Sequence, residues 1–180
     1  MIRGGVAPVL INKEIMKEIK LTQGYVALVD DEDYSKLSTK KWCVALRKGK
    51  PESALRMEQI GFKKQRTIRM HRVVLGITDP KAVIDHIDGN PLNNTKSNLR
   101  ICTQAENAKN RAKMSRGSSV FKGVTLDNKT KKWAVSICCD YKSFYIGKFA
   151  NELDAALAYN NAAKQLHGEF SRINNIGVGV

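Results

Sequence analysis

The segment VIDHIDGN at residues 83–90 constrains the fold most, because an apolar run ends there in adjacent Asp and His residues and a tight turn follows. The apolar run predicts a strand, and the Asp-Gly-Asn sequence predicts a hairpin turn. A neighbouring carboxylate and imidazole, Asp85 and His86, suit a metal ligand beside a general base. The alternative is a hairpin whose polar residues are Asp and His by chance, and this segment alone does not separate the two.

The charge of the chain indicates a polyanionic partner. The 180 residues include 31 Lys and Arg against 17 Asp and Glu, a formal net charge of +14, and nucleic acid is the usual partner of so basic a chain. Residues 40–72 hold eleven basic and two acidic residues, and residues 109–132 hold eight basic residues and one acid. Two basic faces kept for solubility are the alternative, but solubility does not require charges of one sign to be grouped. The Asp-His hairpin lies between the two basic zones.

The N-terminus and the cysteines indicate the cellular compartment of the protein. The apolar stretch within residues 1–14 is too short for a secretion signal, and no segment approaches about eighteen consecutive apolar residues. The four cysteines form no CxxC pair, which argues against a disulfide framework and a four-cysteine zinc site. We therefore expect a cytoplasmic protein that contacts no membrane.

The pattern along the chain divides it into three regions, which are a β-rich 18–75, a hairpin with one helix at 79–116, and three strands with a helix at 117–174. The polar stretch MSRGSS, which begins at residue 114, suits a linker. We therefore expect one domain over residues 1–116 and a second over 117–180. In the second, we expect a helix from about Asn151, its N-cap, to His167, with Gly168 as its stop. Its apolar stripe should consist of Ala155, Ala158, Tyr159, Ala162 and Leu166.

The full hairpin sequence, VIDHIDGNPLNNTKSNLRICTQAENAKNR, predicts a strand–loop–strand–helix unit. Thr103 and Glu106 form a capping box, which places Asn107 in the first turn of the helix. If the helix folds back on the hairpin, Asn107 lies near Asp85 and His86. Carboxylate and amide oxygens are hard ligands that suit Mg²⁺ rather than a soft metal.

These residues resemble the HNH nuclease motif, the ββα-metal finger of many phage and intron-encoded homing endonucleases. The resemblance covers about thirty residues, and the DHIDGNPLNN loop and the NLR tripeptide are particularly similar to that group. It implies that His86 is the general base, that Asp85 and Asn107 are metal ligands, and that Asn98 braces the loop or the scissile phosphate. The last motif position is Asn107 rather than His, which favours Mg²⁺, with Mn²⁺ as an alternative, over zinc or nickel. His71 is expected to be structural.

The C-terminal region resembles the APETALA2-type DNA-binding domain of plant ethylene-response factors, which is also found appended to phage HNH nucleases. The similar segments are FKGVTLDNKTKKWAVSI and FYIGKFANELDAALAYNNAAKQLHGEFSRIN. The resemblance implies a three-stranded sheet whose outer face enters the major groove, while Trp133, Val135 and Ile137 face the helix. Most of the family's arginines are missing from the outer face, which puts its target preference in doubt. The residues expected to contact DNA here and in the linker are Arg111, Lys113, Lys122, Thr125, Lys131, Lys132, Ser136, Tyr145 and Lys148.

The expected fold class is α+β, with a β-rich N-terminal region, a ββα-metal HNH finger at about 79–116, and a three-stranded antiparallel sheet packed on one helix. The expected function is hydrolysis of phosphodiester bonds by a metal-dependent DNA endonuclease acting on double-stranded DNA, with no small-molecule cofactor. The alternative is a DNA-binding regulatory protein with an inactive finger; structured RNA is a less favoured substrate, because no aromatic platform for unstacked bases is evident. A homodimer, the target sequence and the choice between nicking and double-strand cleavage stay open. If the gene is carried by a phage, the expected location is the cytoplasm of its bacterial host.

Overall fold

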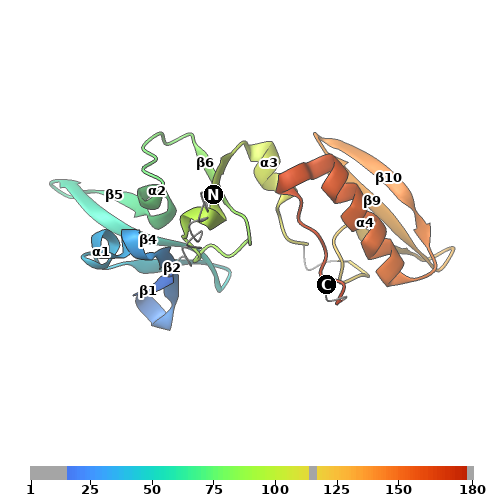
Figure 1. Ribbon diagram of the computed structural model, residues 1–180, viewed down its shortest axis with the longest axis horizontal. Helices are drawn as coiled ribbons and strands as arrows, with labels where there is room; N and C mark the ends of the chain where they lie inside the picture. The colour runs from blue at the N-terminus through green and yellow to red at the C-terminus, as the bar shows by residue number, and fades with distance from the viewer. Residues whose placement is uncertain (1–15, 114–116, 178–180) are drawn as a thin grey trace, which may run out of the picture. The chain divides into compact units, whose positions relative to one another are not determined.

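The computed structural model describes residues 16–113 and 117–177 (Figure 1). The segment judged unsuited to a secretion signal, residues 1–14, lies outside the described residues, as does the start of the expected linker at 114–116. The described chain forms two compact units. The first holds residues 16–76 and 91–97, and the second holds residues 77–90 and 98–177. The predicted domain boundary between residues 116 and 117 stays a prediction.

The first unit is β-rich, as its sequence predicts. Its elements are β1 (Met16–Lys20), η1 (Thr22–Gly24), β2 (Val26–Asp30), α1 (Asp31–Ser38), β3 (Cys43–Arg47), β4 (Lys50–Gly61), β5 (Lys64–Arg69) and α2 (Met70–Val74). Strands β1 and β2 form an antiparallel pair, and β3, β4 and β5 form an antiparallel sheet in sequence order. Ala27, Val29, Leu37 and Met70 are buried, and the indole Nε1 of the buried Trp42 donates to the Leu37 carbonyl oxygen at 2.9 Å.

The second unit begins with the hairpin and helix of the finger. Its elements are β6 (Val83–His86), β7 (Leu99–Cys102) and α3 (Gln104–Lys109). The short η2 (Lys96–Asn98), whose first two residues belong to the first unit, leads into β7. Strands β6 and β7 pair antiparallel, and α3 packs against β6. The predicted capping box is confirmed, because the Thr103 hydroxyl accepts from the Glu106 N–H at 3.2 Å and the Glu106 carboxylate accepts from the Thr103 N–H at 2.7 Å.

The remainder of the second unit is a three-stranded sheet covered by one helix. Strands β8 (Val124–Asp127), β9 (Lys132–Cys139) and β10 (Lys142–Phe149) are antiparallel, with β9 in the centre. Helix α4 (Glu152–His167) follows, and η3 (Gly168–Phe170) ends it. The predicted N-cap is confirmed, because the Asn151 side chain accepts from the Leu153 N–H. The predicted stop is confirmed as well, because Gly168 has a φ of 54°, which favours glycine.

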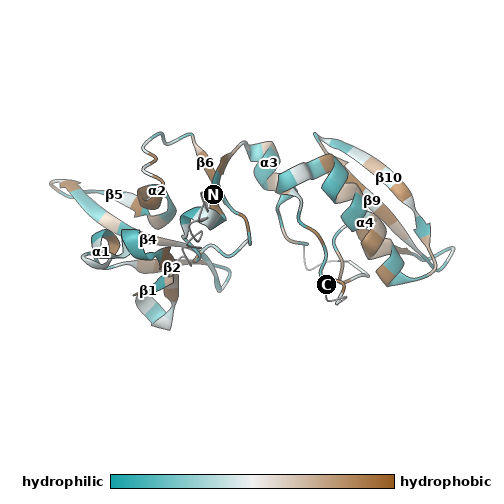
Figure 2. Ribbon diagram, viewed as in Figure 1, coloured by the Kyte–Doolittle hydropathy of each residue, from teal (hydrophilic) through white to brown (hydrophobic). Residues whose placement is uncertain are grey.

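The core of this sheet and helix agrees with most of the predicted pattern. Val135 and Ile137 are fully buried against α4, and Trp133 packs at the edge of the same cluster. Figure 2 shows α4 with both apolar and polar stretches, as a helix with one buried face should have. The predicted stripe is right for Ala155 and Tyr159, which are buried, and for Ala162, which packs against the same cluster, and it is wrong for Leu166, which is 36% exposed.

The prediction failed at Leu166 because two polar residues take part in the buried face of α4. Asn160 and His167 are buried, and each has a hydrogen-bond partner that a hydrophobicity pattern does not include. The Tyr159 ring lies directly against Gly123, where an added Cβ would come within 2.1 Å of the ring. The fold class is thus α+β, as predicted. In the described ranges, no helix combines the length and apolar character that crossing a membrane requires.

Candidate active site

Asp85 lies at the centre of a buried polar network in the finger. The register of the hairpin sets Asp85 opposite Arg100. Arg100 donates to the Asp85 Oδ2 atom from Nε at 3.0 Å and from Nη2 at 2.7 Å. The Asp85 side chain is 7% exposed and the Arg100 side chain 12% exposed, so this is a buried ion pair. Both donors converge on one carboxylate oxygen, and charge-assisted hydrogen bonds of this kind are stronger than neutral ones.

Asn110 completes the network and was not among the predicted site residues. It caps the C-terminus of α3 and is buried. Its Nδ2 atom donates to both Asp85 carboxylate oxygens at 3.0 Å, to the His86 carbonyl oxygen at 2.9 Å and to the Ile87 carbonyl oxygen at 3.3 Å. The only sequence signal for it is the second Asn of AENAKNR, three residues after Asn107 and therefore on a neighbouring part of the helix surface.

Asn107, the predicted metal ligand of α3, is half-buried. Its backbone N–H donates to the Thr103 carbonyl oxygen at 3.0 Å, as a first-turn residue should. Within residues 16–113 and 117–177, its side chain makes no hydrogen bond, unlike that of Asn110. The amide oxygen of Asn107 is therefore not committed to a structural contact, and its assignment as a metal ligand stays a prediction.

His86 is the last residue of β6 and is half-buried. For Asp85 and His86 to act on one phosphate, the strand has to bend or end at this pair, because consecutive residues of a regular strand point to opposite faces. Strand β6 does end at His86, and the Gly89 N–H then closes the turn by donating to the His86 carbonyl oxygen at 2.8 Å. The role of His86 as general base stays a prediction.

Asn98 ties the two sides of the loop together. Its Oδ1 atom accepts from the Asp88 N–H at 3.0 Å, and its Nδ2 atom donates to the Asp88 Oδ1 atom at 2.9 Å. Its carbonyl oxygen accepts from the Ile87 N–H at 2.9 Å. Asn98 is buried, so these contacts favour bracing of the loop over contact with the phosphate, the two roles that the sequence left open.

The donor set suits a hydrated hard cation better than a metal held wholly by protein. No group of three or more His, Cys, Asp or Glu side chains in the described parts of the chain could hold a metal ion. The Asp85 Oδ2 atom accepts from Arg100 and Asn110, whereas Oδ1 accepts from Asn110 alone. A carboxylate oxygen has two lone pairs, so Oδ1 keeps one for a cation. Mg²⁺ commonly keeps several waters and binds only one or two protein oxygens, and Asp85 and Asn107 stay its predicted ligands.

The segment that follows α4 packs on the finger within the second unit. The Arg100 Nη1 atom donates to the Glu169 carbonyl oxygen at 2.7 Å, and the same guanidinium lies 4.0 Å from the centre of the Phe170 ring. Arg172 donates to the Asp88 carbonyl oxygen at 3.0 Å. Arg100 therefore contacts both Asp85 and the end of the C-terminal sheet-and-helix region.

The outer face of the C-terminal sheet carries several of the predicted DNA-binding residues. Thr125, Ser136 and Tyr145 are exposed, and Ser136 lies opposite Tyr145 in the register of β9 and β10. Lys148 forms an ion pair with Asp127, which raises the pKa of the Lys148 amine and lowers that of the Asp127 carboxyl. Lys132, the first residue of β9, is exposed and shares this face with Ser136 by strand alternation. Arg111 and Lys131 are exposed outside the strands, and Lys113 is half-buried. Their contacts with DNA stay predictions.

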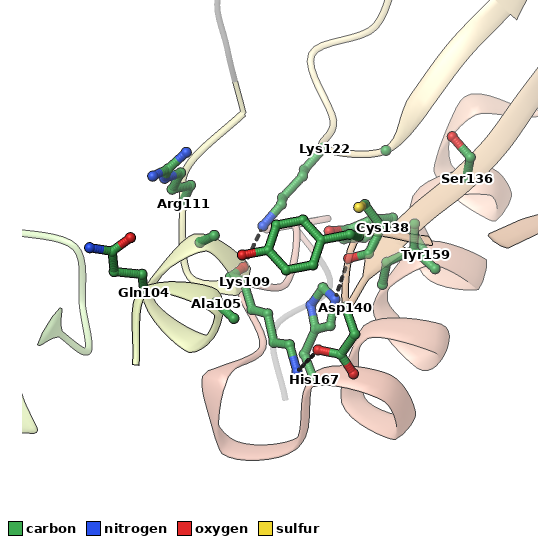
Figure 3. Close-up of a pocket in the computed structure, with 14 residues that line it drawn as sticks. Gln104, Ala105, Lys109, Arg111, Lys122, Ser136, Cys138, Asp140, Tyr159 and His167 are labelled. Atoms are coloured by element: carbon green, nitrogen blue, oxygen red, sulfur yellow. Dashed lines mark hydrogen bonds and ion pairs between the residues drawn. The ribbon is translucent and has the colours of Figure 1, made fainter. Parts of the chain in front are cut away.

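Lys122 does not lie on that face. Strand β8 begins two residues later, at Val124, so strand alternation does not apply to Lys122. Its Nζ atom donates to the Lys109 carbonyl oxygen at 2.7 Å, beside a pocket between α3 and β9 (Figure 3). Desolvation, and after it the positive charge of Arg172, lowers the pKa of the Lys122 amine to about 8.

Comparisons with known proteins agree with both resemblances. Residues 70–109 match the HNH endonuclease family, and residues 119–169 match the AP2 domain family. A protein of Acanthamoeba polyphaga mimivirus described as an uncharacterized HNH endonuclease is 32% identical over 114 residues, which are 61% of this chain and 58% of the viral protein. Protein 3.8 of Escherichia phage T7 is 30% identical over 89 residues, which are 49% of this chain and 73% of the phage protein.

The hairpin, its Asp-His pair and the following helix define a ββα finger of the HNH class, joined to a three-stranded sheet with one covering helix. The chain belongs to the HNH endonuclease family and carries a C-terminal AP2 domain. It spans 58% of the length of its mimiviral relative.

Proposed function

We propose that this protein is a metal-dependent DNA endonuclease that hydrolyses phosphodiester bonds in double-stranded DNA. The observation that carries the proposal is the fixed Asp85 carboxylate, which Arg100 and Asn110 orient beside His86 at the end of β6. Asp85 is a buried acidic residue held by four hydrogen bonds beside an exposed turn, and it serves the fold poorly if burial is its only purpose, because charges are costly to bury. Its position beside an imidazole suits phosphodiester hydrolysis.

The chemistry assigns each residue a separate task. His86, as a neutral imidazole, accepts the proton of the attacking water at physiological pH. Asp85 and Asn107 are the residues that would hold Mg²⁺ or Mn²⁺ through their side-chain oxygens. A bound ion would supply positive charge to offset that of the phosphate and of the leaving 3′-oxygen, which takes a proton from water, so that the ends would be a 5′-phosphate and a 3′-hydroxyl. Asn98 holds the Asp88 loop closed, which fixes the turn that follows His86.

The AP2 domain and the basic zones hold the substrate. Exposed Lys131 and Lys132, at the start of β9, suit DNA phosphates, while Thr125, Ser136 and Tyr145 on the outer face suit contacts within a groove. Arg111 and Lys113 follow α3 and extend this positive surface from the finger. A single active site cleaves one strand, so a nick is the expected first product, and a double-strand break requires a second copy or a second event.

The metal assignment is tested by incubating supercoiled plasmid with the protein over a range of Mg²⁺ concentrations. We expect nicked circles to accumulate, EDTA to stop the reaction, and Asp85→Asn to abolish it. Asp154→Asn, which removes an exposed carboxylate from the first turn of α4, is the matched control and should cleave normally. Cleavage that persists in EDTA would show the metal assignment to be wrong, and a protein that binds DNA without cutting it under any of these conditions would be a regulator with an inactive finger.

A further inference from the structure

The second unit contains a pocket of about 410 Å³ that the nuclease chemistry does not use. Helix α3 forms one wall, and Lys122 with Gly123, the edge of β9 and the end of α4 form the others. The pocket opens where β9 continues past the start of β8, so that Ser136 and Cys138 border it. Its volume falls in the range of sites for small ligands the size of a nucleotide.

The lining is mostly apolar, and its charged side chains are three cations and one carboxylate. Lys109, Arg111 and Lys122 line the pocket, and Asp140 is the one carboxylate among the lining residues. Asp140 is already paired with Lys109 at 3.3 Å, and Figure 3 shows this pair at one side of the pocket with Lys122 approaching from the other. Two positive charges are therefore left without a carboxylate within the pocket, which favours an anionic ligand.

Among the residues that line the pocket, Lys122 has the strongest physical reason to bind an anion. Its ammonium group has three donors, and among the described residues only the Lys109 carbonyl oxygen accepts from it. It forms no ion pair with a described carboxylate, although it is half-buried and burial of a cation is costly unless the cation is paired. Its lowered pKa has the same cause.

His167 adds a buried hydrogen-bond acceptor without a described partner at the pocket. It is 5% exposed, and its Nε2 atom lies 2.9 Å from the Cys138 carbonyl oxygen. Because a carbonyl only accepts, Nε2 carries the proton and Nδ1 is the acceptor of the neutral ring. Within the described residues, Nδ1 is buried without a hydrogen-bond partner. Buried polar groups in native proteins are rarely left in this state without a reason.

We propose that this pocket binds a nucleotide through its phosphate, with Lys122 and Arg111 as the phosphate ligands and the apolar walls of Ala105, Ala108 and Ile137 beside the remainder of the molecule. The ligand is either a free nucleotide or a nucleotide at the end of a DNA strand, because both present the same phosphate chemistry. This site is separate from the Asp85 network and does not depend on cleavage.

The test is calorimetric titration of the full-length protein, without divalent metal, with inorganic phosphate and with thymidine 5′-monophosphate. We expect saturable binding of the nucleotide, weaker binding of inorganic phosphate, and a loss of affinity of about tenfold or more in Lys122→Met, as for a lost charge-assisted hydrogen bond. Lys164→Met removes the same charge from an exposed position of α4 outside the pocket and should bind like the unaltered protein.

A second variant and a competition experiment can also contradict the proposal, and the competition experiment distinguishes a free nucleotide from the end of a DNA strand. Arg111→Gln changes an exposed residue and should also weaken binding, so the test survives if Lys122→Met does not fold. A short duplex with a 5′-phosphate end should compete with the nucleotide if the ligand is a strand end, whereas an unaffected titration would assign the pocket to free nucleotides. The proposal is wrong if neither phosphate nor nucleotide binds, or if Lys164→Met and Lys122→Met weaken binding equally.

Discussion

The Arg100 guanidinium binds the Asp85 carboxylate with two hydrogen bonds, of 3.0 and 2.7 Å, while its remaining nitrogen donates to the Glu169 carbonyl oxygen at 2.7 Å. The charge partner of the proposed metal ligand is thus also a contact of η3, which follows the AP2 helix. Asp85 therefore depends for its orientation on a residue that the C-terminal region helps to hold.

Replacing Arg100 should destabilise the protein strongly. Arg100→Leu leaves the Asp85 charge buried without its partner, and breaking such a pair typically costs on the order of 3–5 kcal/mol in the free energy of unfolding. Urea unfolding followed by circular dichroism measures the loss. Arg66→Leu breaks an exposed ion pair with Glu58 and should cost far less. Equal losses in the two variants would contradict the structural importance of the Asp85–Arg100 pair.

The two asparagines of α3 should separate stability from activity. Asn110→Ala leaves Asp85 and two backbone carbonyls short of a donor, and we expect a loss on the order of 1–3 kcal/mol in the free energy of unfolding together with slower cleavage. Asn107→Ala should leave the unfolding free energy almost unchanged, because its side chain has no hydrogen bond within the described residues, yet it should raise the Mg²⁺ concentration needed for cleavage.

Urea unfolding and a Mg²⁺ titration of plasmid nicking on both variants test this contrast. If Asn107→Ala cleaves at the normal Mg²⁺ concentration, Asn107 is not a metal ligand. If Asn110→Ala is as stable as the unaltered protein, the network around Asp85 is not structural.

Local features of the finger and of the C-terminal region could be predicted from the sequence, whereas the role of Asn110 could not. The capping box at Thr103 and the cap at Asn151 were predictable because they are local patterns of a few residues. The burial of Val135 and Ile137 followed from strand alternation. Asn110 could not be assigned, because its contacts with Asp85 join positions 25 residues apart and depend on how α3 packs on β6.

Lys122 was assigned to the wrong surface and His167 was not recognised as buried, for a related reason. Strand β8 begins two residues after Lys122, and strand boundaries are poorly predicted from sequence. The side chain of Lys122 was therefore assigned to the outer face of the sheet, whereas it contacts the Lys109 carbonyl oxygen. His167 is a polar residue on a buried helix face, and only its contact with the Cys138 carbonyl oxygen accounts for its place there. A hydrophobicity pattern favours Leu166 instead, which is partly exposed.

His167 should make the protein less stable in mild acid. Burial lowers the pKa of the His167 imidazole below the 6.5 of an unfolded chain, so the unfolded state takes up a proton more readily than the folded state. The unfolding free energy should therefore fall as pH drops below about 6.5, until the folded protein also binds the proton. Thermal melts between pH 8 and 5 measure this, and His167→Gln should have a flatter profile. An identical profile in both proteins would exclude His167 as its source.

DNA binding should depend on salt through specific lysines of the sheet. Lys132→Ala removes an exposed amine without an ion pair in the described structure, so the slope of log K against log salt should fall by about one. Tyr145→Ala should weaken binding without altering the slope, because its contact is not ionic. Fluorescence anisotropy with a labelled duplex at several salt concentrations distinguishes the two effects. A slope that Lys132→Ala leaves unchanged would remove Lys132 from the phosphate contacts.

The central claim is that Asp85 and His86 form the active site of a DNA endonuclease, and the rate of plasmid nicking by His86→Ala tests it most directly. In Mg²⁺ and at equal DNA occupancy, verified by gel shift, this variant should nick supercoiled plasmid at least ~10²-fold more slowly than the unaltered protein, as for a lost general base. Its unfolding curve should stay close to that of the unaltered protein. Nicking at an undiminished rate would remove His86 from the mechanism and contradict the account of the site.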